Sequence, residues 1–267
     1  RDSYKRSRKI PSLLDLFSLP TWFRKYFWSY ILYTPELLSE PEEAIRYCEH
    51  ILRWLKEAVR RIEKEPGSPF TKEIASTLMQ YLNVIPSYCT PVGNGELMTL
   101  RARVIEFTLG NSGWKLDMPV QPRGQRRTGQ KIRVGVLNSH FGVQTETFVT
   151  LPALHLDKDR FDVHLFCGTK NPGPLEDRCR SLAKGFHLLP ESIQERVQMI
   201  RNAKLDVLII GTNITAVTNQ IALLAAFRMA PIQVVSHCSP MTSGFKNSDA
   251  FLSCLLYTSD AADDTPC

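Results

Sequence analysis

The stretch that decides the fold is Lys131–Leu154, KIRVGVLNSHFGVQTETFVTLPAL. It opens with an apolar run at 132–137, and its β-branched content is typical of a strand buried on both faces of a parallel sheet. Small polar residues follow, Gly142 interrupts the chain, and an apolar helix is expected from about 146 to 155. In doubly wound folds the loop after such a strand lies at the carboxyl edge of the sheet, where ligands bind. Residues 138–146 are therefore the first candidate site.

The same alternation continues downstream. Apolar runs predict strands at 162–167, 205–210 and 232–235, and helices are expected at about 175–184, 192–204 and 219–228. Ser192 and Glu195 have the spacing of a capping box at the start of the second of these helices. Alternating units of this length imply a parallel sheet with right-handed crossovers. We therefore predict an α/β fold with a Rossmann-like parallel-sheet domain.

The chain upstream of Lys131 reads as helical. Residues 13–33 are dense in aromatic side chains, and 39–64 carry apolar residues at a steady spacing of three to four. Further helices are expected at 71–85 and 96–109. Residues 117–131, DMPVQPRGQRRTGQK, have the composition of a linker. The predicted organisation is a helical domain at 1–116, a linker at 117–131 and a Rossmann-like domain at 132–253.

The amino-acid composition limits the kinds of ligand and the cellular compartment that we expect for this protein. A formal net charge of +6 over 267 residues is compatible with anionic ligands, but the default interpretation is a solvated basic surface, so nucleic acid is not an expected partner. No window of about 18 apolar residues predicts a membrane span. Seven cysteines, odd in number and without CxxC spacing, favour reduced thiols and a cytoplasmic protein.

Three loops are expected to converge at the carboxyl edge of the sheet, and they are rich in hydroxyls and amides. Such a lining suits hydrogen bonds to sugar hydroxyls or phosphate oxygens better than it suits a metal. The predicted substrate-binding residues are Ser139, Thr212, Asn213, Thr215, His237, Thr242, Ser243 and Gly244.

Several site motifs are absent from the sequence. The first strand–helix turn lacks G-x-G-x-x-G, so no nicotinamide or flavin cofactor is predicted, and neither a P-loop nor a G-x-S-x-G elbow occurs. His140 and His237 stand on different loops, without a cysteine or carboxylate at metal-ligand spacing. For each of them a structural role is as open as a catalytic one.

Four segments together resemble a known family: 133–141 (RVGVLNSHF), 161–166 (FDVHLF), 228–233 (RMAPIQ) and 242–244 (TSG). Their order and spacing resemble the catalytic region of the O-linked N-acetylglucosamine transferases, and more closely their bacterial SPINDLY-type relatives. The resemblance implies the first half of a GT-B fold, a UDP-sugar donor and no bound cofactor. It also implies metal-free transfer, with N-acetylglucosamine as the expected sugar, to Ser or Thr hydroxyls of a protein or peptide acceptor.

The sequence departs from the family at one motif. The family pattern S-D-F-x-x-H reads here Ser139-His140-Phe141-Gly142-Val143-Gln144, so His140 stands at the aspartate position and Gln144 at the histidine position. A glutamine cannot act as a general base at neutral pH. Either His140 or Glu146 substitutes for the histidine, or this branch works differently, or it is inactive. The candidate catalytic residues are therefore His140, Gln144 and Glu146.

The end of the chain resembles a translated sequencing adapter, so the natural part of this sequence is predicted to stop near Ser253 and residues 254–267 to be an artefact, with a genuine short tail as the alternative. The chain would then be a glycosyltransferase fragment, inactive by itself. Two alternatives stay open. One is a non-catalytic protein-interaction module derived from a transferase, and the other is a doubly wound domain that binds another small molecule.

Overall fold

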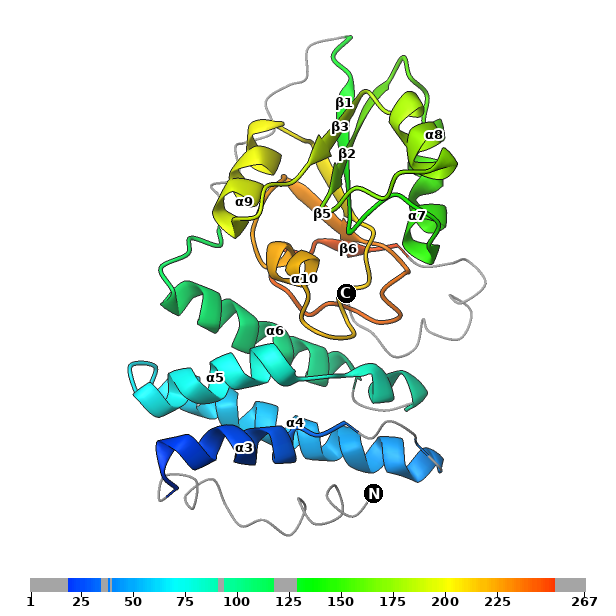
Figure 1. Ribbon diagram of the computed structural model, residues 1–267. Coiled ribbons are helices and arrows are strands. Elements are labelled where there is room, and N and C mark those ends of the chain that lie inside the picture. Colours follow the sequence, from blue (N-terminus) through cyan, green and yellow to red (C-terminus); the bar gives the residue numbers. More distant parts are fainter. Residues whose placement is uncertain (1–18, 35–37, 39, 91–93, 118–128, 253–267) are drawn as a thin grey trace. The chain divides into compact units, whose positions relative to one another are not determined.

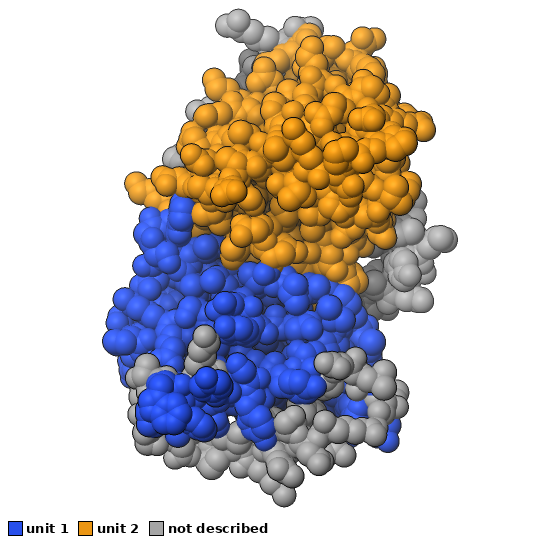
Figure 2. Space-filling model, viewed as in Figure 1, with its two compact units in different colours: residues 1–114, 216–218 blue, residues 115–215, 219–267 orange. Residues whose placement is uncertain are grey.

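The computed structural model describes residues 19–34, 38, 40–90, 94–117 and 129–252, in two compact units (Figure 1, Figure 2). The first unit holds the chain up to Trp114 together with Ala216–Thr218, and the second holds Lys115–Thr215 and the chain from Asn219 onward. Most of the predicted linker (118–128) and the whole predicted tail (254–267) lie outside the described residues. The five described cysteines are free thiols: Cys48, Cys89, Cys167, Cys179 and Cys238.

The first unit is helical. Its elements are α3 (Thr21–Ile31), α4 (Pro41–Lys64), α5 (Pro69–Tyr81), η1 (Ile85–Cys89) and α6 (Asn94–Asn111). The long α4 packs against α5, η1 and α6 because its apolar residues return every three to four positions and form one buried stripe. The predicted helix at 71–85 is α5, which ends at Tyr81. The next turn is a 3-10 helix with Pro86 near its start. In the part of the chain that is described, no helix combines the length and apolarity needed to cross a membrane.

Residues 216–218 belong to the first unit although both of their flanking segments belong to the second. Asn83 pairs with Val217 in an antiparallel bridge, and Val84 N donates to Ala216 O at 3.0 Å. Arg101 of α6 is 1% exposed and donates to Thr218 Oγ1 at 3.3 Å. Burial lowers the pKa of the Arg101 guanidinium to about 10.

The second unit is built on a six-stranded parallel sheet of order β3-β2-β1-β4-β5-β6. The strands are β1 (Ile132–Asn138), β2 (Phe161–Cys167), β3 (Gly185–Leu188), β4 (Val207–Ile210), β5 (Ile232–Val235) and β6 (Ala250–Phe251). The chain is therefore α/β, with a Rossmann-like domain after a helical region. The sequence did not reveal β3 and β6, since each is short and neither carries a continuous apolar run.

Helices cover the sheet on both faces. The helices are α7 (Thr145–Thr150), η2 (Leu151–His155), α8 (Pro174–Leu182), α9 (Ile193–Asn202) and α10 (Gln220–Ala225). Residues of α8 and η2 pack with Val134, Val136 and Leu165 in one core, while α9 and α10 lie on the opposite side (Figure 1). The helix predicted at 146–155 changes to 3-10 form at Leu151, next to Pro152. The predicted capping box is wrong, because the Ser192 side chain makes no capping hydrogen bond.

Candidate functional site

The strand order reverses between β1 and β4. β1 starts a run that proceeds outward to β2 and β3, and β4 starts the run on its other side. Leu137 pairs with Ile210, so the two strands end side by side. Open α/β sheets bind their ligands outside the carboxyl ends of the strands at such a switch point.

The first two loops pack closely against each other at this point. Asn138 is fully buried, and its Nδ2 donates to Thr150 Oγ1 at 3.1 Å and to Glu146 O at 3.4 Å. A Cβ added to Gly211 would lie 2.0 Å from Asn138 Oδ1, so only glycine permits this approach. Ser139 N donates to Thr212 Oγ1 at 2.7 Å, so the buried Thr212 hydroxyl holds the first loop.

The structure separates the roles of the three candidate catalytic residues. Gln144 Nε2 donates to His140 O at 2.6 Å, so the carboxamide closes the turn before α7. His140 is partly exposed, and its Nδ1 accepts from Gly142 N at 3.1 Å. The Glu146 carboxylate is partly exposed in the first turn of α7 and raises the pKa of the Cys238 thiol, although burial is the larger cause of that shift.

In the second loop, which follows β4, most polar side chains form hydrogen bonds within the loop or to the start of α10. Asn213 Oδ1 accepts from Thr215 N at 2.9 Å and from Thr215 Oγ1 at 3.0 Å. Asn219 Nδ2 donates to Asn213 O at 3.1 Å, and Asn219 Oδ1 caps α10 by accepting from Ala222 N at 2.7 Å. Thr215 is fully buried. Of the predicted binding residues in this loop, Asn213 alone is partly exposed.

The third loop begins at the same edge. Ser236 Oγ donates to Gly211 O at 3.0 Å, and Ile214 N donates to Ser239 Oγ at 3.2 Å, so the second and third loops are tied together. His237 is exposed, as is Thr242. Ser243 is 2% exposed, and its hydroxyl donates to Ser248 Oγ at 2.9 Å. The structure thus brings His237 to the edge, while Ser243 is used inside the return segment toward β6.

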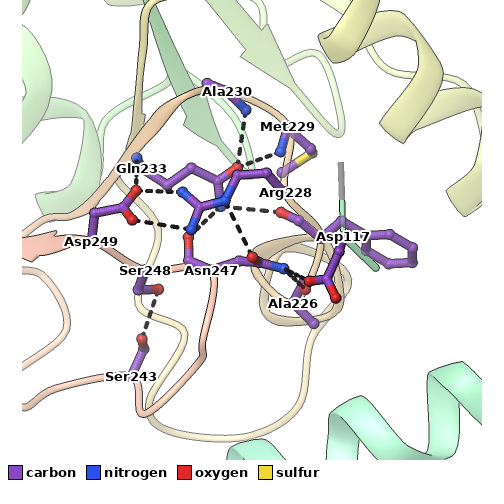
Figure 3. Close-up of polar contacts among 11 residues, drawn as sticks. Asp117, Ala226, Arg228, Met229, Ala230, Gln233, Ser243, Asn247, Ser248 and Asp249 are labelled. Atoms are coloured by element: carbon purple, nitrogen blue, oxygen red, sulfur yellow. Dashed lines mark hydrogen bonds and ion pairs between the residues drawn. The ribbon is translucent and has the colours of Figure 1, made fainter. Parts of the chain in front are cut away.

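A buried polar network holds this return segment (Figure 3). Arg228 is bidentate to Asp249, and its Nε donates to Asn247 Oδ1 at 3.2 Å. Gln233, fully buried, accepts at Oε1 from Met229 N (2.6 Å) and Ala230 N (3.2 Å), and its Nε2 donates to Phe227 O (3.1 Å) and Asn247 O (2.8 Å). Gly244 lies in the same segment with φ +71°, a conformation that favours glycine. The motif residues 228–233 and 242–244 therefore build the loop.

Sequence reasoning missed a fourth loop at this edge, residues 168–173 after β2. Gly168 N donates to Asn138 O at 3.3 Å, and Thr169 N donates to Ser139 O at 2.9 Å. Asn171 Nδ2 lies 3.3 Å from His140 Nδ1. The rule that selected the other loops would have found this one, because it also follows a predicted parallel strand directly.

The assembled edge offers hydroxyls, amides, the imidazoles of His140 and His237 and the carboxylate of Glu146. Among the residues that the structure describes, no three or more His, Cys, Asp or Glu side chains are grouped so that they could hold a metal ion. The chemistry available from His140 and Glu146 is hydrogen bonding and proton transfer.

No protein-family model matches the chain, and no curated protein matches it. Among solved structures it is similar to a mutant of the O-GlcNAc transferase from Thermobaculum terrenum, with 14% sequence identity and a TM-score of 0.49. The superposition covers 79% of this chain and 40% of that one, so the chain spans less than half the length of the structure it matches. A similarity this low does not place the chain in the family.

Proposed function

We propose that this chain supplies one Rossmann-like half of a GT-B glycosyltransferase that moves a sugar from a UDP-sugar to a Ser or Thr hydroxyl of a protein acceptor. The observation that carries the proposal is the meeting of the loops after β1, β4 and β5 next to the strand-order switch point, with His140 on the first loop and Glu146 in the first turn of α7. N-acetylglucosamine is the proposed sugar, on the strength of the four family-like segments alone.

The geometry narrows the proposed chemistry. The Gln144 carboxamide is bound to the His140 carbonyl, and a carboxamide takes no proton at neutral pH. Glu146 therefore remains as the carboxylate that can accept the acceptor's hydroxyl proton as that oxygen attacks the sugar. His140 remains as a hydrogen-bonding imidazole on the loop that leads into α7. We propose that the transfer needs no metal, because hydroxyl and amide groups predominate at this edge.

The experiment is UDP release by the natural protein that contains this region, assayed with UDP-N-acetylglucosamine and other UDP-sugars, with and without Ser/Thr peptides. Glu146→Gln should lower turnover by about 10²- to 10⁴-fold, the usual contribution of a general base. Glu195→Gln, an exposed carboxylate on α9, is the matched control and should retain activity. Absence of turnover with every UDP-sugar tested would overturn the proposal.

A non-catalytic interaction module is the second candidate. The observation that favours it is the hydrogen bond from the Gln144 carboxamide to the His140 carbonyl, which we call the Gln144 clamp. A glutamine bound to its own loop performs a structural task at the position where the family carries a candidate catalytic histidine. Under this alternative the same protein would bind a stable partner without turnover, and Glu146→Gln would leave the binding unchanged.

A further inference from the structure

The imidazole of His140 sits in an asymmetric hydrogen-bonding environment. Its Nδ1 lies 3.1 Å from Gly142 N and 3.3 Å from Asn171 Nδ2. A backbone N–H is always a donor, so Nδ1 must present its lone pair, and the neutral ring must carry its proton on Nε2. No hydrogen bond to Nε2 is found in the described part of the chain, so the N–H of the ring is free to meet a ligand.

Asn171 is held where it can make this contact. Asn171 N donates to Glu176 Oε2 at 2.7 Å, and Arg180 Nη2 donates to Glu176 Oε1 at 2.9 Å. Glu176 is 2% exposed, and the short, charge-assisted bonds to a buried carboxylate fix the backbone on which Asn171 stands.

The residues that hold Asn171 are also linked, through Phe186, to the neighbour of His140. The Arg180 guanidinium lies over the Phe186 ring, 3.8 Å from its centroid. Phe186 packs edge-to-face on Phe141, the residue after His140, with centroids 5.8 Å apart. Both ends of the His140–Asn171 contact therefore rest on one packed group, which limits how far the two side chains can move apart.

Gly142 provides the space for the amide. A Cβ added there would lie 2.3 Å from Asn171 Nδ2 and 2.5 Å from Asn171 Cγ. The loop after β1 thus contributes both a backbone donor to Nδ1 and the gap through which Asn171 reaches the same nitrogen.

We propose that Asn171 is a positioning residue that, together with the Gly142 amide, makes His140 a hydrogen-bond donor through Nε2. In this site His140 then donates to an oxygen of the substrate, such as a phosphate oxygen of the UDP leaving group, and Glu146 is left to accept the acceptor's proton. This inference rests on the proposed function for its substrate, but the assignment of the ring proton does not.

The decisive test is nitrogen NMR of the imidazole in the full chain at about pH 8.5, where free histidine is neutral. The wild type should show a protonated Nε2 and a lone-pair Nδ1 for His140. Asn171→Asp places a carboxylate beside Nδ1, where it competes with the Gly142 N–H and should move the ring proton toward Nδ1. Asn202→Asp adds the same charge on α9 and should change nothing. A wild-type ring protonated on Nδ1, or an Asn171→Asp spectrum like that of the wild type, would overturn the proposal.

Two further variants separate positioning from folding. Gly142→Ala keeps the backbone donor but displaces the Asn171 amide, and it should weaken the Asn171 effect on the Nδ1 resonance while the melting temperature stays near that of the wild type. In the natural protein that contains this region, Asn171→Leu should lower kcat by about tenfold with KM within about twofold. A tenfold rise in KM with kcat unchanged would contradict the positioning role of Asn171. If the NMR result holds while no variant or wild type turns over any UDP-sugar, the proposed function fails and the role of Asn171 stands.

Discussion

The Gln233→Leu substitution tests whether the buried amide network builds the loop after β5. Leucine has a similar volume but removes four hydrogen bonds to backbone groups, at residues 227, 229, 230 and 247. Each such hydrogen bond contributes about 1 kcal/mol, and a buried N–H left unpaired costs more than a carbonyl. The expected loss is about 3–5 kcal/mol of the second unit's free energy of unfolding, near the upper end for a single substitution.

The assay must follow the second unit. The four tryptophans belong to the first unit, which holds the chain up to Trp114, so their fluorescence does not report on the network. Amide hydrogen exchange of Met229 and Ala230, whose N–H groups Gln233 accepts, reports on it directly. Protection of both amides should fall together with the urea midpoint measured by circular dichroism.

Gln198→Leu is the matched control. Gln198 is exposed on α9 and makes one side-chain hydrogen bond, to Asn202 Oδ1 at 2.7 Å. Its removal should change stability by no more than about 0.5 kcal/mol. If Gln233→Leu costs no more than this control, or if the exchange of the two amides is unchanged, the network does not hold the loop and the reasoning is refuted.

Three other perturbations follow from the packing. Gly211→Ala should cost about 2 kcal/mol or more in an unfolding experiment, because the new Cβ meets Asn138 Oδ1 at 2.0 Å, while Gly173→Ala, with nothing within 4 Å, should be near neutral. Arg101→Ala should lower the first unit's stability by about 2–4 kcal/mol, read by tryptophan fluorescence, because it empties a fully buried site. Burial, then the His187 charge, lowers the pKa of His164, so the unfolded chain binds more protons. The melting temperature should therefore fall as pH drops below about 6.5, and it should fall less in His164→Phe; an equal fall in both would contradict this.

Periodicity and strand chemistry located most of the second unit in advance. The run at 132–137 became the central strand β1, and the prediction for 232–235 matches β5 residue for residue. Both are buried on both faces, so the continuous apolar run was a direct signal. The sequence pattern did not reveal β3, because this edge strand includes Gly185 and His187 and has no continuous apolar run. Its hydrogen-bonded pairing with β2 defines it as a strand.

The candidate site was less accessible to sequence reasoning. Loop positions followed from the rule that ligands bind at the carboxyl edge, so His140 and Glu146 could be selected. The Gln144 clamp could not be read from the chain, because the partner of a side-chain amide depends on the turn that the backbone makes. Asn171 was overlooked for a related reason, since its contact joins residues 31 positions apart.

The sequence by itself determined four of the six strands with the helices that follow them, the helical nature of the first unit and the absence of the common nucleotide motifs, because these depend on periodicity and local chemistry. Only the tertiary structure decided the strand order, the joining of residues 216–218 to the first unit and the contact between His140 and Asn171. Each of these depends on contacts between residues far apart in the chain, whose energies no local pattern encodes.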